Sequence, residues 1–271
     1  MSRMFVFLSG KGGVGKSTLA ANLSVLIARA GHSTALVDTD LGLRCQDLLL
    51  GLESNIVYDL LDAARGKCAL SQALVEMPDL PALHLLPANQ FARCRDLDPA
   101  KLRKILKQLR DTHEFVFIDC PAGLEKGLRN VLNAGRDLQP ILVVTPDDLS
   151  LRDGERALAL LEQKRQPQSR LIVNRLQADL ISAGEQYSAA TVAALLDLPL
   201  LGEVPEDPAV YRAQLRGKLA SDFQCPAGSA LARIAGRLLG NETPLPAIGS
   251  KKPALMRRIF QQKMKELNRR S

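Results

Sequence analysis

The 271-residue chain contains 46% hydrophobic and 24% charged residues, which is typical of a globular protein with a large hydrophobic core. It has no run of about 20 apolar residues and no signal-peptide pattern, which argues against a membrane-spanning helix and favours a cytoplasmic protein. Its five scattered cysteines argue against a disulfide framework or a metal cluster, and its net charge of +7 comes from the last 21 residues, since residues 1–250 are balanced.

The first predicted strand, residues 4–8, is followed by a glycine-rich loop and a predicted helix over 17–30. The loop sequence G-K-G-G-V-G-K-S-T matches the phosphate-binding pattern G-x-x-x-x-G-K-[ST]. Its glycines allow backbone N–H groups to surround one anion, and the helix start adds its positive dipole end. We expect Lys16 to contact the β- and γ-phosphates of a nucleotide and the Ser17 hydroxyl to bind Mg²⁺. The other expected phosphate-binding residues are Gly12, Gly13, Val14, Gly15 and Thr18.

Lys11 occupies the second position of the loop, where the general pattern accepts any residue. One interpretation is a solvated loop lysine, because lysine is mostly exposed. The other is a lysine that reaches a phosphate, including one bound to a partner subunit.

The second predicted strand, residues 33–38, ends beside two carboxylates, Asp38 and Asp40. Residues at i and i+2 share one side of an extended segment. Phosphoryl transfer needs mainly positioning and charge neutralisation, so one carboxylate suffices to orient the attacking water. We expect Asp40 to orient the water and Asp38 to support it, and the alternative is a pair of surface loop aspartates.

A later apolar segment, F-V-F-I-D over residues 115–119, predicts a strand that ends at Asp119. It follows predicted helices at 56–64 and 99–112 and a predicted strand at 83–87. Downstream of a phosphate loop, this arrangement is a Walker B motif, and we expect Asp119 to hold Mg²⁺ directly or through water. Gly123, in the next turn, either donates its N–H to the γ-phosphate or is an ordinary turn glycine.

Strand-like and helix-like segments alternate over the rest of the chain. Further strands are predicted at 139–145, 169–173 and 199–204, and further helices at 124–135, 150–165, 188–196, 207–214 and 226–239. The strands are continuous apolar runs, as expected when both faces of a sheet are covered. We therefore predict an α/β fold with a doubly wound, mostly parallel sheet and helices on both faces. The predicted units are an ATPase domain over 1–240, a linker over 241–252 and a tail over 253–271.

The tail predicts an amphipathic helix with a basic face. Its apolar face contains Leu255, Met256, Ile259, Phe260, Met264 and Leu267, and its polar face begins with Arg257 and Arg258. A helix of this kind favours an anionic membrane surface. The alternatives are a solvated tail, a helix packed on the body and a nucleic-acid-binding arm.

These motifs together resemble the MinD/ParA family of deviant Walker A ATPases, and within it the MinD group. The similarity is carried by K-G-G-V-G-K-S-T (11–18), D-T-D-L-G-L-R (38–44) and D-C-P-A-G-L-E (119–125). In this family the extra loop lysine crosses the interface of a nucleotide-sandwich dimer, which is the role implied for Lys11. The resemblance also implies a P-loop NTPase fold, an ATP-dependent homodimer, and ATP and Mg²⁺ as cofactors.

The same resemblance implies roles for residues in the second half of the chain. Asp153 is expected at the dimer interface. The residues expected around the adenine base are Asn174, Arg175, Pro205, Glu206 and Asp207. One position departs from the family, because Cys45 stands where asparagine is expected, so partner-triggered hydrolysis is expected to differ.

The function implied is an ATPase that dimerises with ATP and binds reversibly to the inner face of the bacterial membrane in division-site selection. A MinC-like inhibitor and a MinE-like activator of hydrolysis are the implied partners. One alternative is a regulator of flagellar number or placement, and another is a binding module without turnover. A ParA-type DNA-partition ATPase is a third, but residues 1–250 carry balanced charge, and the 4% aromatic content without tryptophan disfavours nucleic-acid modules that stack bases.

Overall fold

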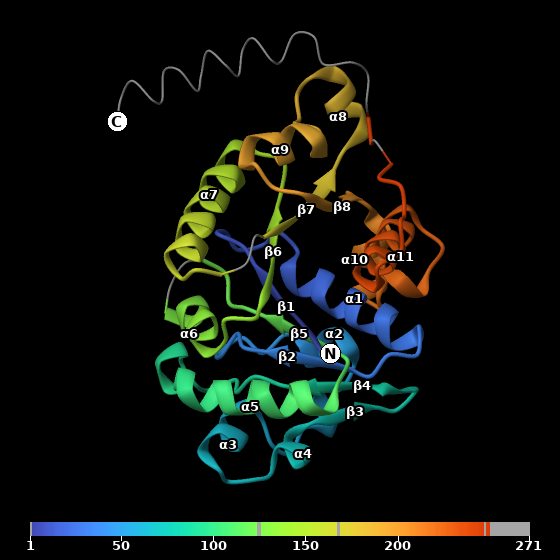
Figure 1. Cartoon of the computed structure of the whole chain (residues 1–271). Helices are drawn as coiled ribbons and strands as arrows, with labels where there is room; N and C mark the ends of the chain where they lie inside the picture. Colours follow the sequence, from blue (N-terminus) through green and yellow to red (C-terminus); the bar gives the residue numbers. More distant parts are fainter. Residues whose placement is uncertain (1, 124–125, 167–168, 247, 250–271) are drawn as a thin grey trace.

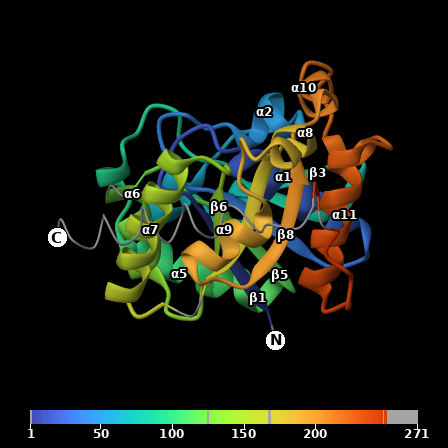
Figure 2. The same ribbon diagram turned by 90° about the horizontal axis from the view of Figure 1, so that it is seen from above.

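The computed structural model describes residues 2–123, 126–166, 169–246 and 248–249. In this part of the chain, eight strands form one sheet in the order β3-β4-β2-β5-β1-β6-β7-β8 (Figures 1 and 2). All neighbouring strands are parallel except the β3–β4 pair. The strands are β1 (Arg3–Leu8), β2 (Thr34–Asp38), β3 (Val75–Met77), β4 (Leu80–Leu86), β5 (Phe115–Asp119), β6 (Gln139–Val144), β7 (Arg170–Leu176) and β8 (Leu200–Pro205).

Helices cover both faces of the sheet (Figure 2). One face packs against α3 (Leu60–Arg65), α5 (Pro99–Thr112), α6 (Lys126–Ala134), α7 (Asp148–Gln163) and α9 (Ala189–Leu196). The other face packs against α1 (Lys16–Arg29) and α11 (Pro226–Leu239). Short helices complete the described part: α2 (Gln46–Leu50), α4 (Leu70–Ala73), α8 (Ala178–Ala183) and α10 (Pro208–Gln214). The predicted doubly wound α/β fold is confirmed.

Strand β1 illustrates why the central strands read as continuous apolar runs. Successive side chains of a strand point to opposite faces. Met4, Val6 and Leu8 are buried in the core on one side of the sheet, and Phe5 and Phe7 are buried in the core on the other. The strand has no solvent-facing side, so no polar alternation is left in its sequence.

The structure adds elements that the sequence did not predict. Strand β3 forms a hairpin with β4 across Pro78-Asp79 and extends the sheet by one antiparallel edge strand. Its three residues are too few to show a periodicity, and so are the four to six residues of α2, α4 and α8. Strand β4 also begins three residues before the predicted start at 83.

The described part of the predicted linker lies along the edge strand β8. The Arg237 guanidinium, from the end of α11, donates to the carbonyl oxygens of Leu201, Thr243 and Pro244. Further on, the Ile248 N–H donates to the Glu203 carboxylate at 3.1 Å. These contacts hold Thr243, Pro244 and Ile248, within the predicted linker, against the domain.

The predicted amphipathic tail over 253–271, with its helix predicted over 253–268, lies outside the described residues. Among the residues that are described, no helix combines the length and apolar character needed to cross a membrane.

Candidate nucleotide site

The glycine-rich loop joins β1 to α1 at the carboxyl edge of the sheet, where open α/β sheets bind ligands. Gly13 and Gly15 have φ values of 80° and 91°, a region that disfavours residues with a Cβ. A Cβ on Gly15 would also clash with the Asn174 amide nitrogen, and one on Gly10 with the Asp153 carbonyl. The loop therefore needs its glycines both for its conformation and for its close packing.

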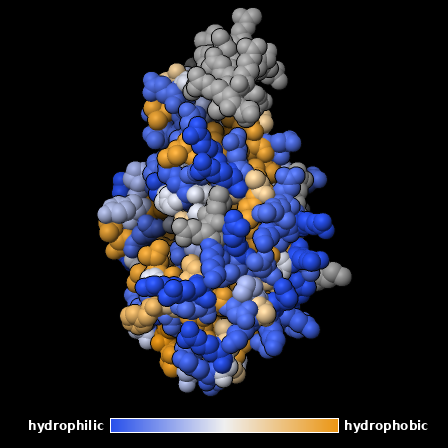
Figure 3. Space-filling view, turned by 90° about the vertical axis from the view of Figure 1, so that its left-hand side faces the viewer, coloured by the Kyte–Doolittle hydropathy of each residue, from blue (hydrophilic) through white to orange (hydrophobic). Residues whose placement is uncertain are grey.

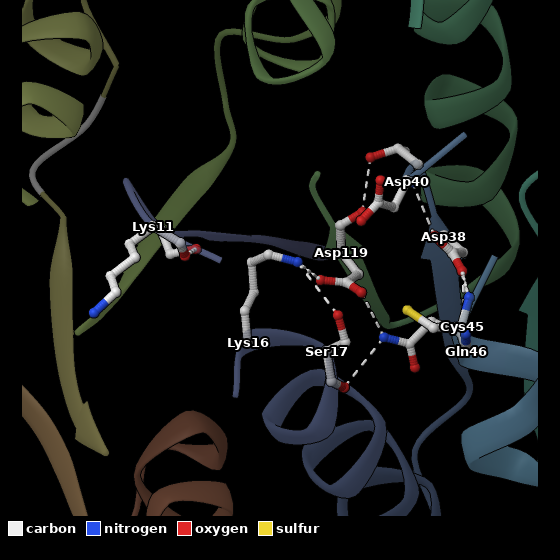
Figure 4. Close-up of polar contacts among 10 residues, drawn as sticks. Lys11, Lys16, Ser17, Asp38, Asp40, Cys45, Gln46 and Asp119 are labelled. Carbon is white, nitrogen blue, oxygen red and sulfur yellow. Dashed lines mark hydrogen bonds and ion pairs between the residues drawn. The ribbon is translucent and has the colours of Figure 1, made fainter. Parts of the chain in front are cut away.

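The two charged residues expected at the phosphate and metal positions contact each other. The Lys16 ammonium lies 2.5 Å from Asp119 and 3.3 Å from the Ser17 hydroxyl, and both members of the ion pair are buried (Figure 4). Burial disfavours the charged ammonium, but the charge and hydrogen bond of Asp119 outweigh it and raise the pKa of Lys16. A buried cation is thus placed beside the loop amides, where it can neutralise a bound phosphate.

The donor set fits Mg²⁺ held partly by a nucleotide. Ser17 and Asp119 offer oxygen donors, which Mg²⁺ prefers, and it usually keeps waters and substrate phosphates as its other ligands. The described residues contain no group of three or more histidine, cysteine or acidic side chains that could hold a metal ion. The site therefore suits a metal that arrives with phosphates.

Gln46 is a site residue that sequence reasoning missed. Its amide nitrogen donates to the second oxygen of Asp119 at 2.6 Å and to the Ser17 carbonyl at 3.1 Å. Its side-chain oxygen is buried and has no hydrogen-bond partner among the described residues. Gln46 begins the short helix α2, so no periodic pattern in the sequence marks it.

Asp38 and Asp40 have different surroundings. The buried Asp38 carboxylate accepts from the N–H groups of Asp40 at 2.9 Å and of Cys45 and Gln46 at 3.1 Å each, and so fixes the loop after β2. Burial, followed by the charge of Asp119, raises the pKa of Asp38 to about 7.

Asp40 is only partly buried, and its carboxylate makes no hydrogen bond to the described residues. Burial raises its pKa, although the Lys16 ammonium opposes the shift. Asp38 therefore holds the loop through three backbone N–H groups, whereas the Asp40 carboxylate makes no such contact among the described residues.

Cys45 lies at the site itself, with its thiol beside the Ser17 side chain (Figure 4). Burial, and then the charges of Asp38 and Asp119, raise the pKa of this thiol to about 12. Cys45 therefore contributes a neutral thiol next to the expected Mg²⁺ ligand, where the family resemblance leads one to expect an amide.

Lys11 points away from Lys16 and Asp119 (Figure 4). Its ammonium is part-exposed and lies 3.8 Å from Asp147, the N-cap of α7. Asp153, six residues further along α7, pairs with Arg156 at 3.4 Å and packs its backbone against Gly10. The structure thus places Asp153 beside the loop and directs the Lys11 side chain toward Asp147, away from Lys16.

A cavity of about 480 Å³ lies next to the loop and α1. Its walls include all the residues expected around the base, together with loop residues: Gly15, Thr18, Asn174, Arg175, Pro205, Glu206 and Asp207. The size is in the range of small-molecule sites. The residues expected at the base therefore come together in three dimensions from strand β7, from the end of β8 and from the two residues that follow β8.

Contacts within this cavity separate side chains that are available to a ligand from those that are not. The Asn174 amide nitrogen donates to the Val14 carbonyl at 2.8 Å, which leaves its oxygen and its second amide hydrogen for a base edge. The Asp207 carboxylate accepts from the N–H groups of Ala209 and Ala227 and so supports the loop.

The Gly123 N–H donates to the Ser9 carbonyl at 3.1 Å, which favours the turn interpretation of this glycine.

Comparison with known proteins agrees with this geometry. The profile of the CobQ/CobB/MinD/ParA nucleotide binding domain matches residues 5–220. The septum site-determining protein MinD of Bacillus subtilis (strain 168) is 38% identical over 264 residues, which cover 96% of this chain and 97% of that protein. The MinD of Synechocystis is 37% identical over 96% of this chain and 97% of its own length.

Solved structures give the same answer. In a MinC:MinD cell division protein complex of Aquifex aeolicus, the similar chain superposes with a TM-score of 0.84 at 33% identity, covering 92% of this chain and all of that one. A MinD from Pyrococcus horikoshii, complexed with Mg-ADP, gives a TM-score of 0.78 at 29% identity and covers 88% of this chain and 96% of that one. The protein therefore belongs to the MinD/ParA family of P-loop ATPases, and within that family to the MinD group.

Proposed function

We propose that this protein hydrolyses ATP to ADP and phosphate with Mg²⁺, and that ATP-dependent dimerisation couples to reversible membrane binding in division-site selection. The observation that carries the proposal is the buried Lys16–Asp119 pair, next to Ser17 and to a cavity that contains the expected base-binding residues. The MinD relatives align with nearly the whole chain, which supports extending their named role to this protein.

In the proposed reaction, Lys16 leaves Asp119 to contact the phosphates, and the freed carboxylate joins Ser17 at the metal side. Mg²⁺ would neutralise phosphate charge there. Gln46 keeps Asp119 oriented, and Asp38 holds the loop that positions Asp40. Asp40 orients the attacking water. Intrinsic turnover is expected to be slow, because no arginine finger is identified within the chain.

A second copy of the chain explains the position of Lys11. Among the described residues, its part-exposed ammonium forms an ion pair with Asp147 alone, at 3.8 Å, and this weak contact would allow it to reach across to a phosphate of a partner subunit. Asp153, on the same side of the loop, would lie at that interface. We therefore propose a homodimer that closes around ATP.

The tail provides the proposed membrane contact. Ordering a helix costs on the order of 1 kcal/mol per residue, which roughly offsets the gain from its basic and apolar side chains at an anionic surface. Two tails on one dimer gain effective concentration, which raises avidity by roughly 10²–10⁴. The proposed site of action is the cytoplasmic face of the bacterial membrane, with a MinC-like inhibitor and a MinE-like activator as partners.

The test combines sedimentation with anionic liposomes and a mass measurement in solution. With a non-hydrolysable ATP analogue, the full chain should dimerise and pellet, whereas with ADP it should stay monomeric and soluble. A chain truncated after residue 249 should still dimerise but no longer pellet. Equal pelleting with ATP and ADP, or a monomer with the analogue, would contradict the proposal.

A further inference from the structure

A second cavity, of about 990 Å³, lies at the opposite edge of the sheet from the nucleotide loop. It opens between α5, the segment joining α6 to β6, and the end of α7. Its floor includes Met4, Leu106, Leu132 and Leu138, which are almost fully buried. Strand β1, with six residues, separates this floor from the loop by about 20 Å. The cavity is therefore distinct from the nucleotide site.

Cationic side chains surround this cavity. Six of them line it, namely Arg103, Lys107, Arg110, Arg136, Lys164 and Arg165, and Asp137 is the one carboxylate among the lining residues. Figure 3 shows the face that carries α5, α6 and α7, and most of its surface is hydrophilic. The charge balance of residues 1–250 thus conceals a locally basic region.

Two of the six cations already have partners. Arg103 donates to the carbonyls of Asn133 and Ala134 at the end of α6, and Arg110 pairs with Asp137 at 3.2 Å. The side chains of the other four form no salt bridge with any described residue. Asp137, the one carboxylate among the described residues that line the cavity, is therefore already paired with Arg110, and the other four cations have no carboxylate partner there.

Helix ends explain only part of this charge. Helices α6 and α7 both end at the cavity, and a helix C-terminus attracts cations with about half a unit of negative charge. Two such ends supply about one unit for four unpaired cations. The remaining positive charge stands around a recess with an apolar floor, which is the arrangement of a binding site for an anion with an apolar part.

We propose that this cavity binds a small polyphosphorylated molecule with an apolar body, of the nucleoside polyphosphate class. The phosphates would contact Lys107, Arg136, Lys164 and Arg165, and the apolar body would lie over Leu106 and Leu132. The volume supports a small ligand, since sites for small molecules range from about 300 to 1,000 Å³. The recessed floor would be left unused by a flat membrane surface or by the backbone of a nucleic acid.

Calorimetric titration of the full chain tests the proposal, with the nucleotide loop kept saturated with Mg-ADP. The probes are inorganic tripolyphosphate and GTP. The test variant is Lys107→Gln with Arg136→Gln, and the control is Lys101→Gln with Lys104→Gln, which removes the same charge from exposed positions of α5 that do not line the cavity. Thermal unfolding should be the same for both variants, because all four side chains are exposed.

The expected result is one tripolyphosphate per chain, with GTP binding more tightly because its base covers the apolar floor. The test variant should weaken both by at least about tenfold, and the control by less than about twofold. Absence of binding, or equal weakening in the two variants, would overturn the proposal. So would a test variant that loses binding to duplex DNA or anionic vesicles but not to tripolyphosphate, because the ligand would then be a polymer or a surface.

Discussion

Replacing Asp119 by Asn tests the central contact of the site in the nucleotide-free protein. The substitution keeps the size and an acceptor oxygen of the side chain but removes its charge. Lys16, which is 5% exposed and lies 2.5 Å from the carboxylate, would then be a buried cation that has lost its nearest counter-charge. We expect D119N to have a lower free energy of unfolding, because this buried charge destabilises its native state.

The size of the effect follows from the environment of the pair. Breaking a buried ion pair by removing one partner costs about 3–5 kcal/mol. Two features reduce the cost here, since the asparagine oxygen still accepts from Lys16 and the repulsion between Asp38 and Asp119, which raises the pKa of Asp38, is relieved. We therefore expect a loss of about 2–3 kcal/mol in the free energy of unfolding.

The assay is urea unfolding followed by circular dichroism, without nucleotide and in a buffer free of phosphate. The control is Asp137→Asn, which removes the same charge from an exposed pair with Arg110 and should cost less than about 0.5 kcal/mol. ADP without Mg²⁺ should reduce the difference in free energy of unfolding between D119N and the unmodified chain, because its phosphates provide Lys16 with a new counter-charge. Equal losses in D119N and D137N would refute the reasoning.

Three further predictions concern the loops around the site. The pKa of Asp38 is about 7 in the folded protein against an ordinary 3.8, so the native state loses stability as pH rises between these two values. Asp38→Asn removes this penalty. In urea unfolding, the variant should therefore lose less free energy of unfolding, relative to the unmodified chain, at pH 8 than at pH 5. Asp40→Ala should lower ATP turnover at least about 100-fold in a phosphate-release assay while nucleotide binding is kept, and normal turnover would remove Asp40 from its role. Gly15→Ala should abolish ADP binding and lower the free energy of unfolding by about 2–4 kcal/mol in urea, because Gly15 has a φ of 91° and a Cβ there would meet Asn174. The control is Gly66→Ala, which should cost only about 1 kcal/mol, because Gly66 has a φ of 72° but open space around it.

The sequence by itself determined the elements whose signal is local. The backbone conformation of the phosphate loop requires glycines at fixed positions, and burial on both faces requires the unbroken apolar run of β1. Both patterns lie within one short segment, so they can be recognised without knowing which other segments pack against it. The same holds for Lys16, Ser17 and Asp119, because each occupies a fixed position relative to a strand end or a helix start. The alternation of such elements was sufficient to predict the doubly wound sheet.

Contacts between distant segments were decided only by the tertiary structure. Gln46 meets Asp119 across 73 residues, and nothing around Gln46 in the sequence distinguishes it from an ordinary polar residue. The attachment of Thr243 and Ile248 to the edge of the sheet depends on carbonyl and carboxylate groups that become neighbours only when β8 and α11 pack together. The basic cavity is similar, because three separate segments bring their cations to one recess although residues 1–250 carry balanced charge overall. Each residue determines the chemistry of its own side chain, but the tertiary structure decides which side chains come together at one site.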